Sequence, residues 1–152
     1  MDRKSQEKAL REYNGLYRFS NEIYHDAALA AGLSDSAFDI LYCLYDMGDG
    51  CSQKDICEAW YLTKQTVNSS VHKLVREGVV YLDTEGGRGT RLYLTKSGRA
   101  LVEARIAPII EIEKSAFAAM SEEECDELLR LMRLYLGRLR EQVDVFKQEG
   151  VR

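Results

Sequence analysis

Polar side chains that can contact base pairs recur at helical spacing between residues 63 and 77. The amides of Gln65 and Asn68 suit adenine edges, and lysine and arginine suit guanine edges. Serine and threonine hydroxyls, with the backbone amides at a helix N-terminus, can hold phosphate groups. These residue types predict contacts with double-stranded DNA, with sequence reading at Gln65, Asn68, Ser69 and His72. The predicted DNA-binding residues in and before this helix are Ser52, Thr63, Lys64, Gln65, Thr66, Asn68, Ser69, His72, Lys73 and Arg76.

The charge distribution supports an anion-binding surface in the middle of the chain. The 152 residues carry a net charge of −4, yet no acidic residue occurs between Thr63 and Arg76. Residues 51–100 hold eight basic and five acidic residues, a net charge of +3, which leaves −7 for the remainder. The local charge matters most for binding, because charges more than about 10 Å away are largely screened at about 0.1 M salt. An ordinary solvated helix face, the alternative interpretation, would normally mix both signs.

Apolar spacing predicts how this polar face is held. Thr63 can cap the helix and Gly78 can end it in a left-handed conformation. Its inner face, at i, i+4 and i+7, consists of Val67, Val71 and Leu74. A Ser-x-x-acid pattern at Ser52 predicts the start of a second short helix just before it. Two short helices joined by a tight turn form a helix-turn-helix.

Two strand-like runs follow, at residues 79–82 and 91–94, on either side of a glycine-rich loop. They predict a β-hairpin, and a hairpin directly after such a helix is a wing. Glycines let the loop approach a sugar-phosphate backbone closely, and an arginine among them can enter the minor groove. The predicted DNA-binding residues of the wing are Arg88 and Thr90.

The remaining segments read as helices. One covers residues 4–31, and a second starts at Ser34 or Asp35 and ends before the turn at residues 48–50. A helix from Thr95 to about residue 120 is expected to kink at Pro108, and a Ser-x-x-Glu pattern opens the last helix, 121 to about 148. The predicted fold class is mainly α with a small β-hairpin wing (α+β). A winged helix-turn-helix lobe at 34–99 and a helical dimerisation lobe at 1–33 and 100–152 would together form a single domain.

Composition narrows the function classes. Hydrophobic residues make up 45% of the chain, enough for a core, and no apolar run approaches the roughly 18 residues of a membrane span. The N-terminus lacks an apolar signal-peptide core, so we expect a cytoplasmic protein. The chain shows no pairing of nucleophile with base and no metal-ligand spacing, so we expect neither an enzyme nor a metal or cofactor site. Free thiols are expected at Cys43, Cys51, Cys57 and Cys125.

The winged segment resembles the MarR family of bacterial transcription regulators. The resemblance rests on residues 62–80, from Leu-Thr-Lys-Gln-Thr-Val to Arg-Glu-Gly-Val-Val, and on residues 92–101, Leu-Tyr-Leu-Thr-Lys-Ser-Gly-Arg-Ala-Leu. It implies an obligate homodimer on a pseudo-palindromic operator, released by a small ligand. The family's wing usually carries an Asp-x-Arg pair that braces the arginine. Here that pair is absent, and Arg88 is our candidate for the arginine.

The dimer also follows from the last helix, whose apolar stripe is broader than packing on one side requires. A small aromatic or amphipathic effector is expected where the first two helices meet the DNA-binding lobe, although core filling is an equal explanation for the aromatic residues there. The predicted pocket residues are Tyr13, Tyr17, Tyr24, Tyr42, Tyr45 and Trp60. Two alternatives remain open: a winged-helix protein-interaction module without DNA binding, and a cysteine-based redox-responsive regulator.

Overall fold

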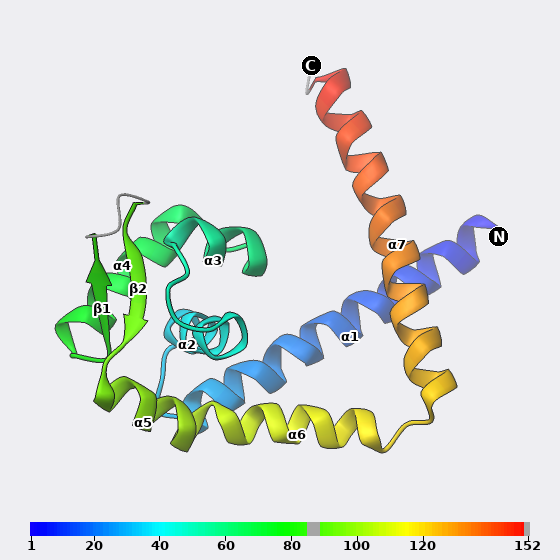
Figure 1. Cartoon of the computed structure of the whole chain (residues 1–152). Coiled ribbons are helices and arrows are strands. Elements are labelled where there is room, and N and C mark those ends of the chain that lie inside the picture. Colours follow the sequence, from blue (N-terminus) through cyan, green and yellow to red (C-terminus); the bar gives the residue numbers. More distant parts are fainter. Residues whose placement is uncertain (85–88, 151–152) are drawn as a thin grey trace. The chain divides into compact units, whose positions relative to one another are not determined.

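The computed structural model describes residues 1–84 and 89–150. The chain divides into two compact units, residues 1–110 and 111–152. This boundary falls inside a helix and differs from the predicted lobes, so the division into a DNA-binding and a dimerisation lobe stays a prediction. The elements are α1 (Arg3–Ala30), α2 (Asp35–Met47), α3 (Gln53–Trp60), α4 (Lys64–Arg76), β1 (Val80–Asp83), β2 (Arg91–Leu94), α5 (Lys96–Arg105), α6 (Ala107–Ala118) and α7 (Glu122–Glu149) (Figure 1). The predicted fold class, mainly α with a two-stranded hairpin, is confirmed.

Side-chain caps start these helices where the sequence predicts them. Ser52 and Ser121 each form a capping box. The serine hydroxyl accepts a hydrogen bond from the backbone amide three residues on, and the acidic side chain of that residue accepts one from the serine amide. Thr63 and Thr95 cap α4 and α5 through their hydroxyls. Because these caps satisfy amides that have no partner within a helix, the short helices α3 and α4 have defined starting points.

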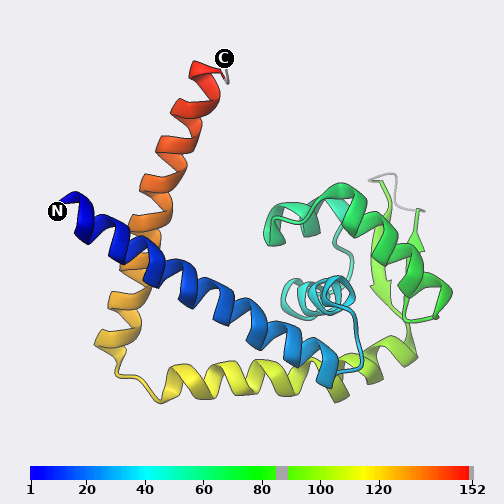
Figure 2. The same ribbon diagram turned by 180° about the vertical axis from the view of Figure 1, so that it is seen from behind.

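The core of the first unit surrounds α2. Its buried face packs against α3, α4 and α5, and α4 in turn lies against the hairpin (Figures 1 and 2). The predicted inner face of α4 is confirmed, because Val67, Val71 and Leu74 are at most 1% exposed. The largest fully buried side chains of the unit include Phe38, Ile40, Leu41, Leu44, Ile56, Leu92 and Ile106. The outer face of α4 is therefore fixed by the burial of its inner face.

The hairpin strands are antiparallel, with Val80 opposite Leu94 and Asp83 opposite Arg91. Cys51, just before α3, extends this pairing through an isolated bridge to Leu92, whose amide donates to the Cys51 carbonyl over 2.9 Å. The α2–α3 connection is therefore hydrogen-bonded to β2 at Leu92.

The helix predicted from Thr95 to about residue 120 is divided at Ile106 into α5 and α6. Pro108 lies in the first turn of α6, where its missing N–H leaves the Ala104 carbonyl without the usual helical partner. The predicted interruption is confirmed. Among the described residues, no single helix is long and apolar enough to cross a membrane, and α1 with α2 reaches that length and composition only as a pair bent by 87°.

The second unit contains the rest of α6 and the 28-residue α7, none of whose residues is buried. Large apolar side chains of α7 are 36–61% exposed, and they occur on more than one face of the helix. They are Leu128, Leu129, Leu131, Met132, Leu134, Tyr135, Leu136, Leu139, Val143, Val145 and Phe146.

Candidate nucleic-acid interface

Helix α4 has one buried and one exposed face. The exposed face presents most of the predicted contact residues to solvent along its whole length: Lys64, Gln65, Asn68, Ser69, His72, Lys73 and Arg76. No described residue of the first unit covers them, so the amide, hydroxyl, imidazole and ammonium groups needed for base and phosphate contacts lie on one accessible surface. The structure brings together the residues that the spacing predicted.

Three further predicted contact residues, Ser52, Thr63 and Thr66, form hydrogen bonds at the N-termini of α3 and α4. The Thr63 hydroxyl accepts from the Thr66 amide over 3.1 Å and lies 2.8 Å from the Thr66 hydroxyl. The Ser52 hydroxyl accepts from the Asp55 amide over 3.1 Å. An oxygen that accepts one hydrogen bond keeps a second lone pair and its own proton. The Ser52 hydroxyl thus keeps its proton for a phosphate, whereas the bond between the two threonine hydroxyls uses one of their two protons, so only one of them at a time can donate to a phosphate; these roles stay predictions.

The positive charge of α4 is only partly neutralised. Lys73 Nζ lies 3.9 Å from the carboxylate of Glu77, and both side chains are about half exposed. An exposed pair of this kind is weak and screened by salt. Lys64 and Arg76 form no ion pair with the described residues, so two cations of this face remain for a polyanion.

The wing is fixed to the start of α3 by a residue that the sequence did not single out. Arg91 of β2 donates to the Gly50 carbonyl over 3.1 Å and to the Asp55 carboxylate over 3.3 Å. The same Asp55 accepts from the Ser52 amide over 2.7 Å, and these bonds from Ser52, with a smaller contribution from Arg91, lower the pKa of Asp55. Thr90 is exposed on the wing, and Arg88 lies outside the described residues.

A second set of contacts joins the end of α4 to α5. The hydroxyl of Thr95 donates to the Gly78 carbonyl over 2.6 Å, and the hydroxyl of Ser97 donates to the same carbonyl over 2.9 Å. Gly78 has the positive φ of 68° predicted for a left-handed cap. The hairpin is thus held at its base, so α4 and the wing are presented together (Figure 2).

The predicted effector residues lie in different surroundings, and their role in an effector site stays a prediction. Tyr42 and Trp60 pack edge to face with ring centroids 5.0 Å apart, and Tyr42 also contacts Phe38. Tyr17 and Tyr24 are 59% and 42% exposed on α1, and Tyr13 is half-buried there. Tyr45 is the one of the six that lines the cavity described next. The Tyr42–Trp60 pair is thus explained by core packing, the alternative that the sequence left open.

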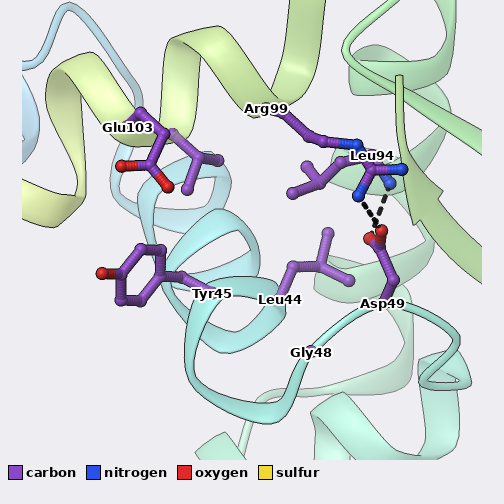
Figure 3. Close-up of a pocket in the computed structure, with 8 residues that line it drawn as sticks. Leu44, Tyr45, Gly48, Asp49, Leu94, Arg99 and Glu103 are labelled. Carbon is purple, nitrogen blue, oxygen red and sulfur yellow. Dashed lines mark hydrogen bonds and ion pairs between the residues drawn. The ribbon is translucent and has the colours of Figure 1, made fainter. Parts of the chain in front are cut away.

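A cavity of about 270 Å³ lies where the end of α2 meets β2 and α5 (Figure 3). The Asp49 carboxylate accepts from the Arg99 guanidinium and, over 2.9 Å, from the Leu94 amide. Tyr45 and Glu103 lie on the opposite side of the cavity from this ion pair. The lining, Leu44, Tyr45, Gly48, Asp49, Leu94, Arg99, Val102 and Glu103, combines apolar walls with charges of both signs. Tyr45 is the one lining residue that the sequence predicted for a pocket.

Two cysteines lie in the core beside the α2–α3 connection. Cys43 is fully buried and Cys51 is 7% exposed. Burial, and next to it the neighbouring Cys51, raises the pKa of Cys43 to about 12, and burial also raises the pKa of Cys51. The thiolate is the reactive form, so both groups are held as unreactive thiols at neutral pH. This argues against a redox role for these two thiols alone, because Cys57 and Cys125 are partly exposed. Within residues 1–84 and 89–150, no three His, Cys, Asp or Glu side chains gather in a way that could hold a metal ion.

Comparisons with known proteins agree with this geometry. Residues 31–89 match a family model described as MarR family. A MarR family regulator from Neisseria meningitidis has a similar fold, with a TM-score of 0.78 at 21% identity over 90% of this chain and 96% of that one. No curated protein matches the sequence at a significant level.

MepR of Staphylococcus aureus is also similar in structure. In a complex with DNA it gives a TM-score of 0.72 at 28% identity, over 84% of this chain and 96% of that one. A second MepR structure is described as a transcription regulator of the multidrug efflux pump MepA. It gives a TM-score of 0.56 at 29% identity, over 84% of this chain and 98% of that one. The predicted resemblance to MarR family regulators, which are non-enzymatic DNA-binding proteins, is confirmed.

Proposed function

We propose that this chain, whose fold is that of MarR family transcription regulators, is a sequence-specific DNA-binding repressor that acts as a homodimer. The main support for this proposal is the outer face of α4, which is exposed, polar and basic. The buried inner face fixes the orientation of that outer face. A structural neighbour at 28% identity that is a protein–DNA complex supports duplex DNA as the partner. A protein with this role acts on DNA in the cytoplasm, where we place it.

The exposed apolar side chains of α7 support the homodimer. A helix with no buried residue and many exposed leucines is stable only when another surface covers it. A second copy is the occupant we propose, because closed twofold dimers are the commonest assemblies and the fold is that of a dimeric family. Such a dimer would place its two α4 helices about 34 Å apart, one turn of DNA. Sedimentation of a monomer at micromolar concentration would contradict this.

Selection of bound sequences from a pool of random duplexes tests the function directly. We expect enrichment of a pseudo-palindrome with half-sites about one helical turn apart, because twofold symmetry in the protein is matched by symmetry in the operator. No enrichment would favour the protein-interaction alternative. A single enriched half-site would support DNA reading by α4 but contradict the dimeric operator.

A charge-removal variant separates DNA binding from protein interaction. In Lys64→Ala/Lys73→Ala/Arg88→Ala, we expect weaker DNA binding and a shallower dependence of log affinity on log salt, by about one unit of slope for each phosphate that is no longer neutralised. Lys147→Ala, on the exposed surface of α7, is the matched control and keeps the slope of the parent. If the triple variant binds as the parent does, the assigned surface is wrong.

The repressor and effector roles have separate tests. A promoter overlapping the selected operator should lose transcription when the protein is present, since a bound dimer excludes the polymerase. We propose the cavity beside Tyr45 as the effector site. Benzoate and benzylamine are aromatic probes of opposite charge. We expect them to weaken DNA binding to different extents, and we expect Tyr45→Ala to abolish this weakening. If neither probe changes DNA affinity, this effector class is wrong.

A further inference from the structure

Tyr61, in the turn between α3 and α4, has a backbone conformation unusual for its residue type. Its φ of 52° and ψ of 28° are left-handed, and it is the one non-glycine residue with a positive φ in the described part of the chain. Side chains with a Cβ are disfavoured there, and glycine or asparagine is the usual occupant at the end of a helix. The local backbone therefore gives no reason for a tyrosine at this position.

Burial does not explain Tyr61 either. Its side chain is 94% exposed, and it makes no hydrogen bond or ring contact with residues 1–84 or 89–150. A large aromatic side chain in a disfavoured backbone conformation, without compensating packing, lowers the stability of the fold. Such positions point to a role outside the fold, since strain tends to persist at functional sites.

The neighbours of Tyr61 hold the turn in place. Trp60 packs edge to face on Tyr42, with ring centroids 5.0 Å apart, and Leu62 packs against the core. Thr63 then caps α4 through the Thr66 amide. The exposed Tyr61 side chain is thus presented from a fixed backbone three residues before Lys64, the first residue of α4.

We propose that Tyr61 contacts the DNA backbone: its phenol donates a hydrogen bond to a phosphate at the edge of the groove that α4 enters. The inference rests on the proposed DNA binding by α4. In a helix-turn-helix the helix before the reading helix crosses the backbone, so its end lies near phosphates rather than base edges. Tyrosine hydroxyls are common phosphate donors, and a bond to a charged acceptor is stronger than a neutral one. The contact is therefore expected to add affinity without sequence preference.

Substitution of Tyr61 tests the proposal, because function and fold predict opposite effects. Tyr61→Asn suits the left-handed conformation, so we expect an unchanged Tm or a rise of about 2–4 °C. We expect its dissociation constant for DNA to rise about tenfold, with Tyr61→Phe losing most of the same affinity because only the hydroxyl is removed. The probes are the duplex selected by the parent protein and an unrelated duplex of equal length. Both should lose affinity equally, with an unchanged salt slope, since no charge is removed.

Four results would overturn part of the proposal. If Tyr61→Asn binds both duplexes as the parent does, Tyr61 does not touch DNA. If affinity and Tm fall together, the tyrosine serves the fold. If the weaker binding is confined to the selected duplex, the residue reads bases and the backbone assignment is wrong. If the parent itself binds neither duplex, the proposed function fails rather than the role of Tyr61 within it.

Discussion

The hydroxyl of Ser70 on α4 donates a 2.7 Å hydrogen bond to the hydroxyl of Ser36 on α2. Ser70 is 9% exposed and lies within the apolar stripe formed by Val67, Val71 and Leu74. A buried hydroxyl must find a partner, so this bond favours one register of α4 on α2 over neighbouring ones. This bond between α4 and α2 therefore helps to orient the exposed face of α4.

Ser70→Ala should therefore destabilise the first unit by about 1 kcal/mol, since it removes the bond and leaves the Ser36 hydroxyl without its partner. Equilibrium unfolding in urea measures the change. Ser69→Ala is the matched control one position away, because Ser69 is exposed and bonds only the local Thr66 carbonyl. We expect it to change stability by less than about 0.5 kcal/mol while weakening DNA binding. Equal destabilisation in the two variants would contradict the anchoring role of Ser70.

The comparison of Ser69 with Ser70 shows what the sequence could predict. Helical spacing separates the faces of α4, and serine and threonine caps mark where helices start, because both are local effects. The Ser70–Ser36 and Arg91–Asp55 bonds join residues 34 and 36 positions apart, and no local pattern identifies such partners. Aromatic composition likewise predicted an effector pocket without distinguishing Tyr42, which packs in the core, from Tyr45, which lines a cavity.

The Arg91–Asp55 pair is expected to stabilise the wing in a pH-dependent way. The pKa of Asp55 is lowered mainly by hydrogen bonds from Ser52, so its stabilisation is present above the unfolded pKa and is lost as pH falls through the folded value. Asp55→Asn should be less stable than the parent at pH 7, and the difference should shrink below about pH 4. Both side chains of the pair are at least about a third exposed, so its coupling should stay below about 1 kcal/mol.

A double-mutant cycle with Arg91→Ala measures that coupling, and Arg91→Lys controls for the charge alone. Both bonds come from one nitrogen of the Arg91 guanidinium, and the shorter, flexible lysine side chain does not hold its nitrogen at that place, so we expect it to recover only part of the stability. Strict additivity of Asp55→Asn and Arg91→Ala would show that the pair does not couple the wing to α3.

Gly98 is expected to tolerate no side chain. A Cβ at this position would overlap the carbonyl oxygen of Val79 and lie 3.3 Å from the Thr95 hydroxyl, because the first turn of α5 packs directly on the start of the hairpin. Gly98→Ala should lower the free energy of unfolding by about 1–3 kcal/mol. At Gly15, inside α1, a Cβ meets nothing within 4 Å, and Gly15→Ala should raise it by about 0.5–1 kcal/mol. If Gly98→Ala were neutral in urea unfolding, the close approach of the two backbones would be wrong.

Asp39 on α2 should destabilise the folded protein at neutral pH. Burial, and secondarily the charge of Asp35, raises its pKa to about 6. The folded state therefore binds this proton more tightly than the unfolded chain does, so the contribution of Asp39 to stability falls as pH rises from about 4 to about 6. Asp39→Asn removes this partly buried charge and should be more stable than the parent at pH 7, by an amount on the order of 2 kcal/mol.

The advantage of Asp39→Asn should shrink as pH falls below about 6 and vanish near about pH 4, where the parent carboxyl is neutral in the folded state and largely so in the unfolded chain. Urea unfolding of both proteins across this range measures the difference. Asp46→Asn, exposed near the end of the same helix, controls for removal of a negative charge from α2 and should show a smaller gain. A difference between Asp39→Asn and the parent that did not vary between about pH 4 and pH 7 would show that folding does not raise the pKa of Asp39.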